Sequence, residues 1–229
     1  FIQEYWDYVF QNFIDEYACG RTPNPDILCN KYIKFDKMLN YAINELKGNY
    51  LATGHYAKLI NGQLHKANDK NKDQSYFIAQ LKKEQLEKVI FPLANYTKDE
   101  IRKIAKKMNL NVANKKDSTG ICFIGERNFS KFLQNYIPSQ PGNIIDISNG
   151  KIVGTHIGVM YYTIGQRKGL NLGGNENKTY VAKKDLENNI LYVASSSEEK
   201  YLYSNEAILE DVNFLTEEKI TSCTCKFRY

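Results

Sequence analysis

The sequence lacks every feature that would send a chain into or across a membrane. It contains no apolar run of about 18 residues or more and no basic-then-apolar N-terminal leader. We therefore expect a cytoplasmic protein with no membrane partner. In a reducing compartment, its five cysteines are predicted to be catalytic or structural rather than paired.

The sequence also lacks the loops that usually cradle nucleotide phosphates. Neither G-x-x-x-x-G-K-[ST] nor S-G-G-x-D-S occurs. If the protein uses ATP, the phosphate-binding part is not in this chain. The first residue is Phe1 rather than Met, and we expect a fragment that lacks both ends of its parent protein.

What is present is an ordinary globular composition. The 229 residues are 42% hydrophobic and 25% charged, enough for one large domain or two smaller ones. The net charge of +5 permits a polyanionic partner. On charge alone, a solvated basic surface is the favoured interpretation.

Hydrophobic periodicity predicts an α/β region followed by a β-rich one. Helical spacing covers 6–17 and 33–46, and a short apolar strand at 50–53 leads into Gly54 and His55. A buried strand ending in Gly is typical of a parallel sheet, whose ligands bind at that edge. Further predicted helices cover 75–81, 84–89, 98–108 and 128–136, and hairpin turns lie at 61–62, 149–150 and 188–189.

The stretch 20–30 (GRTPNPDILCN) is predicted to be a rigid loop. Pro23 and Pro25 fix their own φ angles, and the loop carries Asp26 and Cys29 three residues apart. An acid beside a thiol suits proton transfer next to a sulfur nucleophile. A Pro-rich connector with a buried cysteine is an equally good interpretation of this stretch taken alone.

A second polar loop, 116–125 (KDSTGICFIG), holds Cys122 about 90 residues downstream. Two loop cysteines, each near an aspartate, suggest two thiols meeting in one site. Neither loop has a further Cys or His at ligand spacing, so sulfur transfer or a transient disulfide is favoured over a metal.

Several other candidates have structural alternatives. For His55, a catalytic role and a structural role in packing are equally good interpretations. The polar segment Lys72-Asp73-Gln74 is either a capping loop or a nucleic-acid contact. Cys19 and the pair Cys223 and Cys225 are expected to pack in the interior. The basic helix 98–107 is more simply a solvated face than a phosphate-binding one.

Taken together, the motifs resemble one family. The segments GRTPNPDILCN, IKF, ATGHY, NKDQSYF, KDSTGICFIGER, PG and TIGQRKGL occur in order along the chain. The sequence resembles the tRNA-specific 2-thiouridylases, which are tRNA uridine 2-sulfurtransferases, over essentially its whole length.

The resemblance implies a fold and a reaction. The fold is α/β, the remainder of a Rossmann-like adenine-nucleotide-binding domain of the ATP-pyrophosphatase type, followed by a small mostly-β domain and the start of a β-barrel. Predicted boundaries are 1–137, 138–204 and 205–229. The reaction is ATP-dependent transfer of persulfide sulfur to C2 of the wobble uridine of tRNA, through uridine adenylation. The implied cofactor is ATP with Mg²⁺, and the implied partners are tRNA and a sulfur-donor protein.

The resemblance also implies residue roles. Cys122 matches the persulfide carrier, Cys29 the thiol that closes a disulfide with it, and Asp26 the acid/base. Gly54 matches a backbone contact to ATP. Positions matching contacts to the target base or tRNA are Asn24, Pro25, Asp26, His55, Lys72, Asp73, Gln74, Arg228 and Tyr229.

Two other functions remain open at this point. One is a different RNA-modifying enzyme of the ATP-pyrophosphatase superfamily. The other is a tRNA-binding fragment without catalysis, because we expect these 229 residues alone to be inactive. The basic segments 98–107, 166–168 and 226–228 are expected to gather around Cys29.

Overall fold

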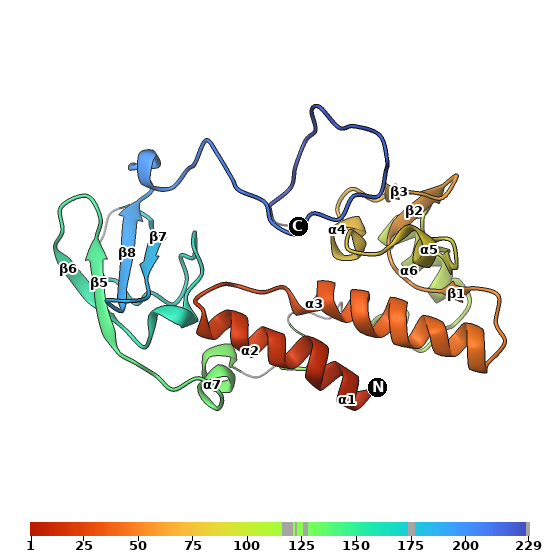
Figure 1. Cartoon of the computed structure of the whole chain (residues 1–229), viewed down its shortest axis with the longest axis horizontal. Coiled ribbons are helices and arrows are strands. Elements are labelled where there is room, and N and C mark those ends of the chain that lie inside the picture. Colours follow the sequence, from red (N-terminus) through yellow and green to blue (C-terminus); the bar gives the residue numbers. More distant parts are fainter. Residues whose placement is uncertain (116–120, 122, 126–127, 174–176, 228–229) are drawn as a thin grey trace. The chain divides into compact units, whose positions relative to one another are not determined.

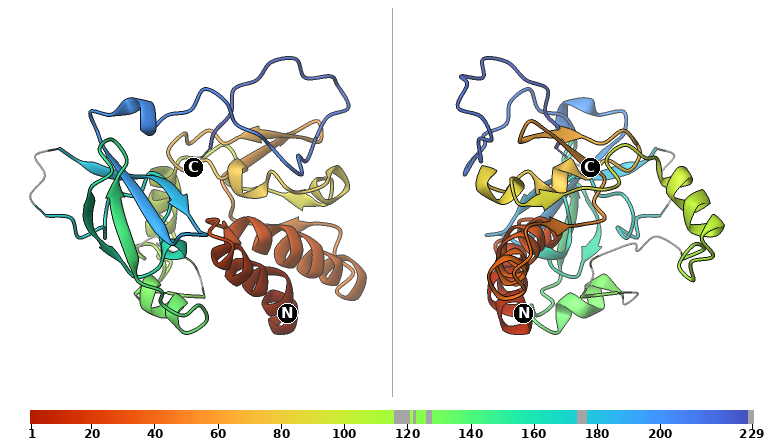
Figure 2. Two further views of the ribbon diagram at one scale, coloured as in Figure 1. Left: turned by 60° about the vertical axis from the view of Figure 1, so that its left-hand side comes forward. Right: turned by 90° about the vertical axis from the view of Figure 1, so that its right-hand side faces the viewer.

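The computed structural model describes residues 1–115, 121, 123–125, 128–173 and 177–227. The chain divides into two compact units (Figures 1 and 2). The first unit comprises Phe1–Val9, Pro25–Thr119 and Asp211–Tyr229, and the second comprises Phe10–Asn24 and Gly120–Glu210. No helix in the described ranges is long and apolar enough to cross a membrane.

The chain opens with consecutive helical segments, as its periodicity predicts. α1 (Ile2–Tyr5) continues through a wide π-type stretch, η1 (Trp6–Phe10), into α2 (Gln11–Ala18). Gly20 ends the helix with φ 71°, and its amide donates to the Tyr17 carbonyl at 2.8 Å. A Cβ at Gly20 would lie 2.4 Å from a methyl group of Leu186, an exposed side chain that can move aside, so the positive φ is the main reason for glycine there.

The next helical segment begins earlier than predicted. α3 (Pro25–Leu28) leads into η2 (Cys29–Met38) and η3 (Tyr41–Glu45). The rigid loop is therefore limited to 21–24, and the prediction of a loop through Asn30 was wrong. Proline has no N–H to lose at the first helical position, and an acidic residue in the first turn complements the helix dipole, so Pro25 and Asp26 start a helix.

Small sheets and short helices complete the first unit. β1 (Leu51–Ala52) pairs in parallel with β4 (Val89–Ile90), and β2 (Ala57–Ile60) forms the predicted hairpin with β3 (Gln63–Lys66). The helices are α4 (Ser75–Ile78), α5 (Lys83–Leu86) and α6 (Lys98–Lys107). The helix predicted at 84–89 ends at Leu86, because Val89 pairs with Leu51 in the parallel sheet. The core of the unit contains Phe35, Leu39, Ala57, Ile78, Leu81, Leu86, Val89 and Phe91.

The second unit contains a four-stranded sheet of order β6-β5-β8-β7 (Figure 1). Its strands are β5 (Gly142–Asp146), β6 (Ile152–His156), β7 (Thr179–Asp185) and β8 (Ile190–Ser195). β5 pairs with β6 antiparallel and with β8 in parallel. The short helices are α7 (Phe129–Gln134), η4 (Val159–Tyr161) and η5 (Glu199–Tyr201). His156 is 2% exposed and its Nδ1 accepts from the Gly158 amide, so it is structural.

The C-terminal segment differs from its prediction. The start of a β-barrel was expected over 205–229, yet the described residues 205–227 form no strand. A strand needs a partner for its backbone groups, and no described segment pairs with this one. Instead, the Asn213 amide donates to the carbonyls of Ala79 and Leu81 at 2.8 and 2.9 Å, and Leu215 packs on the core of the first unit.

Overall, the predicted class is confirmed: an α/β region precedes a small β-rich one. The boundaries 1–137, 138–204 and 205–229 remain predictions.

Candidate functional site

Asp26 and Cys29 lie in the first turns of the helical segment that follows the proline loop. Both side chains are half-buried. Three residues apart on a helix, they share one face, as the sequence predicted for a loop. Burial raises the pKa of the Asp26 carboxyl above its usual value, and the nearby Lys34 ammonium opposes this shift. A carboxyl held in this way can exchange protons with a neighbouring group more easily than a solvated aspartate can.

His55 lies just beyond the C-terminal end of β1. Its Nδ1 is 3.0 Å from the Thr53 hydroxyl, and its ring centroid is 5.5 Å from that of Phe35 and 6.3 Å from that of Phe91. Burial, with a smaller contribution from the Lys34 ammonium, lowers its pKa to about 4. His55 is therefore neutral at pH 7 and offers a hydrogen bond rather than a positive charge.

Lys34 is the feature that links these two groups. Its ammonium acts on the pKa of both Asp26 and His55, so the helix and the end of β1 contribute to one electrostatic site. No pattern in the sequence singles out Lys34 on its own. Its position two helical turns after Asp26, within the IKF motif, is the available signal.

Gly54 lies beside this group with an open backbone. A Cβ added there would meet no atom within 4 Å. No packing reason in the described structure therefore requires glycine at this position. An open backbone at the C-terminal end of a parallel strand suits close approach by a ligand.

Asn30 fixes the helix that carries the acid and the thiol. It is 2% exposed, and its Nδ2 donates to the Phe77 carbonyl at 3.0 Å. Its Oδ1 is buried without a hydrogen-bond partner among the described residues. Farther along the helix, the Gln85 amide donates to the Phe35 carbonyl at 2.7 Å. These contacts hold the helix against α4 and α5. The sequence analysis did not select Asn30, although it closes the GRTPNPDILCN motif.

All three residues of the Lys72-Asp73-Gln74 segment make hydrogen bonds within the protein, and the Lys72 amide donates to the Asp69 carbonyl at 3.2 Å. Asp73 Oδ1 accepts from the Ala67 amide at 2.9 Å, and Gln74 Oε1 accepts from the Tyr56 amide at 3.0 Å. Gln74 also donates its own amide to the Tyr56 carbonyl at 2.8 Å. These contacts shape the loop, whereas Lys72 is exposed.

Lys72 lies at a polar hollow beside the start of α6. The hollow, of about 340 Å³, is lined by Asp69, Asn71, Lys72, Lys98, Asp99 and Arg102. Asp69 accepts the Lys98 amide at 2.8 Å, so a carboxylate already stabilises this helix end. The structure thus places the Lys72 loop next to the basic helix, which the sequence treated separately.

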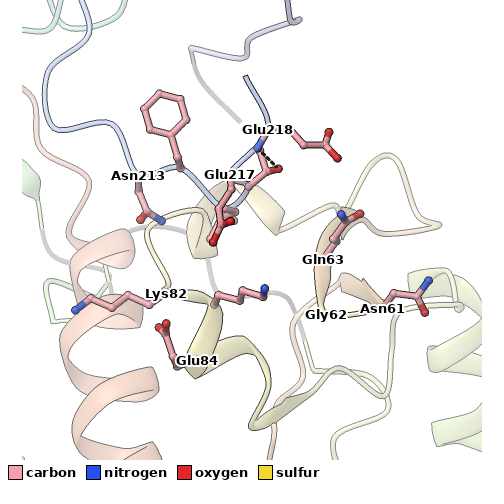
Figure 3. A pocket seen from close by; sticks show the side chains of 12 residues that line it. Asn61, Gly62, Gln63, Lys82, Glu84, Asn213, Glu217 and Glu218 are labelled. Carbon is pink, nitrogen blue, oxygen red and sulfur yellow. Dashed lines mark hydrogen bonds between the residues drawn. The ribbon is translucent and has the colours of Figure 1, made fainter. Parts of the chain in front are cut away.

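A larger hollow of about 560 Å³ lies elsewhere in the first unit (Figure 3). Figure 3 shows Lys82 and Glu84 on one side and Asn213 and Glu217 of the C-terminal segment on the other. Its charges are of mixed sign, and neither Asp26 nor Cys29 lines it. Its size alone therefore does not make it the reaction site.

The remaining cysteines do not pack as predicted. Cys19, Cys223 and Cys225 are all exposed, so the expectation of interior packing was wrong for each. Cys223 and Cys225 lie in the segment that finds no strand partner. Within the described ranges, no three His, Cys, Asp or Glu side chains gather as metal ligands do. Cys122, Arg228 and Tyr229 lie outside the described residues.

Comparison with known proteins decides the family. The model of the tRNA methyl transferase HUP domain matches residues 1–126, more than half of the chain. The chain belongs to this family. A second model, the tRNA methyl transferase PRC-barrel domain, matches residues 130–195. HUP domains are Rossmann-like, in agreement with the predicted fold class.

Curated relatives within the family match the whole chain. The sequence is 64% identical over 230 aligned residues to a tRNA-specific 2-thiouridylase MnmA of Mycoplasmopsis synoviae, covering 100% of this chain and 62% of the relative. It is 59% identical to a protein of the same name from Mycoplasma capricolum subsp. capricolum, with 100% and 64% covered. The family resemblance seen in the sequence motifs is confirmed. The chain spans less than two thirds of these relatives.

Proposed function

We propose that this chain is part of an enzyme that makes 2-thiouridine in tRNA, at the wobble position. The observation that carries the proposal is the identity of 57–64% across the chain to proteins named tRNA-specific 2-thiouridylase. The grouping of Asp26, Cys29, Lys34 and His55 in the first unit supports it, because such a group can move a proton beside a thiol.

The proposed sulfur transfer needs two cysteines. The terminal sulfur of a Cys122 persulfide attacks C2 of the uridine, and the activated oxygen leaves. The Cys29 thiolate then attacks the Cys122 sulfur, which breaks the bond to the transferred atom. The products are 2-thiouridine and a Cys29–Cys122 disulfide, which a reductant must open before the next cycle. A sulfur-donor protein reloads Cys122.

Asp26 is the proposed acid/base in this scheme. A carboxyl with a raised pKa can accept a proton from a thiol or persulfide and return it to a leaving group. Asn24 and Pro25 precede it directly and are proposed to contact the target base. Since Asn30 holds the helix to α4, the position of Cys29 is fixed from the protein interior.

ATP is the proposed cofactor, with Mg²⁺. When bound, it supplies the adenylyl group that makes the uridine oxygen a leaving group. The open backbone at Gly54 fits contact with a nucleotide at the end of β1. The phosphate-binding loop is not among these 229 residues, so this chain accounts for only part of an ATP site.

Binding of tRNA is proposed to use separate groups. Lys72 with the nearby Lys98 and Arg102 offers cations to phosphates, and Arg228 and Tyr229 are proposed contacts by resemblance. The hydrogen bonds of Asp73 and Gln74 favour a positioning role for those two side chains. His55 is proposed to contact the RNA as a neutral group.

The experiment is deletion of the gene followed by mass spectrometry of tRNA nucleosides. Loss of 2-thiouridine, restored by the full-length gene, is the expected result. Unchanged 2-thiouridine with loss of another modified nucleoside would instead favour a different RNA-modifying enzyme. No change in any nucleoside would favour a binding protein without catalysis.

A further inference from the structure

A hollow of about 300 Å³ lies in the second unit, and none of the residues proposed above as catalytic, ATP-binding or tRNA-binding lines it. It is lined by Ile164, Gly165, Tyr180, Val181, Ala182, Ser196, Tyr201, Leu202 and Tyr203. Its volume is at the lower end of the range for small-ligand sites. Three of the lining residues are tyrosines, and the remaining side chains are mostly aliphatic.

Two side chains that line the hollow are exposed, while one beneath them is buried. Tyr203 is 76% exposed and Ile164 is 45% exposed, whereas Val181 in the floor is fully buried. Aromatic rings that stand open over an apolar floor can stack on a flat, weakly polar partner. A nucleobase is such a partner, because every base has a π-face.

A rigid basic loop is joined directly to the wall of this hollow. The Gly165 amide donates to the Val181 carbonyl at 2.7 Å, and the Val181 amide donates to the Gln166 carbonyl at 2.9 Å. The Gln166 side chain accepts from the Thr163 amide at 3.0 Å and donates to the Lys168 carbonyl at 2.9 Å. Within this braced loop, Arg167 and Lys168 are both exposed.

Two further cationic residues contact residues that line the hollow. The Ser196 amide donates to the Lys178 carbonyl at 2.7 Å, and the Lys200 ammonium is 4.7 Å from the centroid of the Tyr201 ring. Of the two nearby acids, Glu198 accepts the Ser195 amide at 2.9 Å, which leaves Glu199 as the exposed acid. Among the described residues named here, four basic side chains accompany two acidic ones, and this net positive charge complements a phosphate backbone.

The hollow is also connected to the segment that precedes the proposed target-base contacts. The hydroxyls of Thr22 and Thr163 are 3.0 Å apart. Thr22 comes two residues before Asn24, and Thr163 comes one residue before Ile164 in the wall of the hollow. If the target nucleotide binds near Asn24, the nucleotides adjacent to it in the RNA could therefore reach the hollow.

We propose that the hollow binds one unpaired base of the tRNA loop that presents the target uridine. The base stacks on the tyrosines, and Arg167, Lys168, Lys178 and Lys200 contact phosphates beside it. This inference rests on the proposed function. Proteins that act on a single base commonly hold its flanking nucleotides, and unpaired loop bases are the ones that can splay onto aromatic side chains.

The test uses the full-length protein and a stem-loop RNA that carries the target uridine. Tyr203→Leu keeps an apolar side chain and removes the ring, and Tyr50→Leu is the matched control because Tyr50 is 58% exposed and belongs to the first unit. We expect Tyr203→Leu to weaken binding about tenfold, in the range of one base–aromatic stack. Tyr50→Leu should bind like wild type.

A second arm locates the base. Each unpaired loop nucleotide other than the target is replaced in turn by an abasic one. We expect a single position at which the abasic RNA and Tyr203→Leu together weaken binding no more than either does alone. Arg167→Ala should reduce the salt slope by about one unit, while Tyr203→Leu should leave the slope unchanged.

Additive effects at every loop position, or wild-type binding by Tyr203→Leu, would overturn the inference. Wild-type binding by Tyr203→Leu is the result expected if another part of the full-length protein covers the hollow. Formation of 2-thiouridine by the wild-type protein is measured in parallel. If the wild type makes 2-thiouridine and the effects of Tyr203→Leu and of the abasic substitutions on binding are additive at every loop position, only this inference fails. If the wild type makes none, the proposed function fails.

Discussion

Lys34 is a charged residue that acts on the pKa of both Asp26 and His55, where burial is the larger cause of each shift. Its ammonium opposes the burial-driven rise in the pKa of Asp26 and adds to the burial-driven fall in the pKa of His55. One cation thereby favours a charged carboxylate and a neutral imidazole. That combination provides a proton acceptor beside Cys29 without a second positive charge.

Replacing Lys34 tests this arrangement. Lys34→Met removes the charge but keeps most of the aliphatic stem, so the pKa of Asp26 and the pKa of His55 should both rise. NMR titration of the carboxyl and ring signals measures both. Lys31→Met is the control, since Lys31 lies on the same helix and its ammonium is 3.2 Å from the Gln80 amide oxygen. Equal titration curves in wild type and Lys34→Met would contradict the assignment.

His55 predicts a pH dependence of stability. Its folded-state pKa of about 4 lies below the ordinary value of 6.5. Its contribution to stability is therefore present above pH 6.5 and is lost as the pH falls toward 4. Between pH 7 and 5, wild type should lose about 1–2 kcal/mol more unfolding free energy than His55→Phe does. Urea unfolding at each pH measures this. Parallel losses in both proteins would show that the imidazole titrates normally.

At the scale of elements, the sequence predicted most helices and hairpins but not the start of the second helical segment. The motif around Pro23 and Pro25 was assigned to a loop because two prolines restrict the backbone. A proline can also open a helix, and Pro25 does so here. A single sequence does not show whether a proline lies in a loop or at the first position of a helix. Asn30 was missed because its role depends on Phe77, a contact 47 residues away.

α6 is the element whose local signals agreed fully with the structure. Thr97 and Glu100 form a capping box: the Thr97 hydroxyl accepts the Glu100 amide, and the Glu100 carboxylate accepts the Thr97 amide at 2.7 Å. The helix then carries Lys98 and Arg102 to the hollow beside Lys72.

Removing this cap gives a prediction at the same scale. Thr97→Ala should lower the unfolding free energy by about 1 kcal/mol, since it removes a side-chain acceptor from the first turn. Thr224→Ala, at an exposed position outside any helix, is the control. Denaturant unfolding measures both. A loss in Thr97→Ala no greater than in Thr224→Ala would mean that the cap adds nothing to stability.

At the scale of the whole molecule, patterns along the sequence predicted the order of α/β and β-rich parts. They failed for the C-terminal segment, because strand propensity there has no partner strand to act on. Asn213 and Leu215 instead attach this segment to the first unit. The exposure of Cys223 and Cys225 follows from the same missing pairing.

The sequence contains neither G-x-x-x-x-G-K-[ST] nor S-G-G-x-D-S, and from this we predict weak nucleotide binding. These 229 residues should show no saturable ATP binding at micromolar concentrations, because Gly54 alone supplies few contacts to a triphosphate. Isothermal titration calorimetry with Mg²⁺ and ATP measures this, with the full-length protein as the positive control. Tight binding by the 229-residue chain would show that the nucleotide site lies within it.

The central claim is that Cys29, together with Cys122, carries sulfur to uridine. The most direct measurement is 2-thiouridine formed by full-length wild type, Cys29→Ser, Cys122→Ser and Cys19→Ser, quantified by mass spectrometry of the tRNA. Cys19→Ser is the matched control, since Cys19 is an exposed thiol at a helix end. The account predicts loss of 2-thiouridine in the Cys29 and Cys122 variants with folding retained, and wild-type levels in Cys19→Ser. Near-wild-type 2-thiouridine in either Cys29→Ser or Cys122→Ser would contradict it.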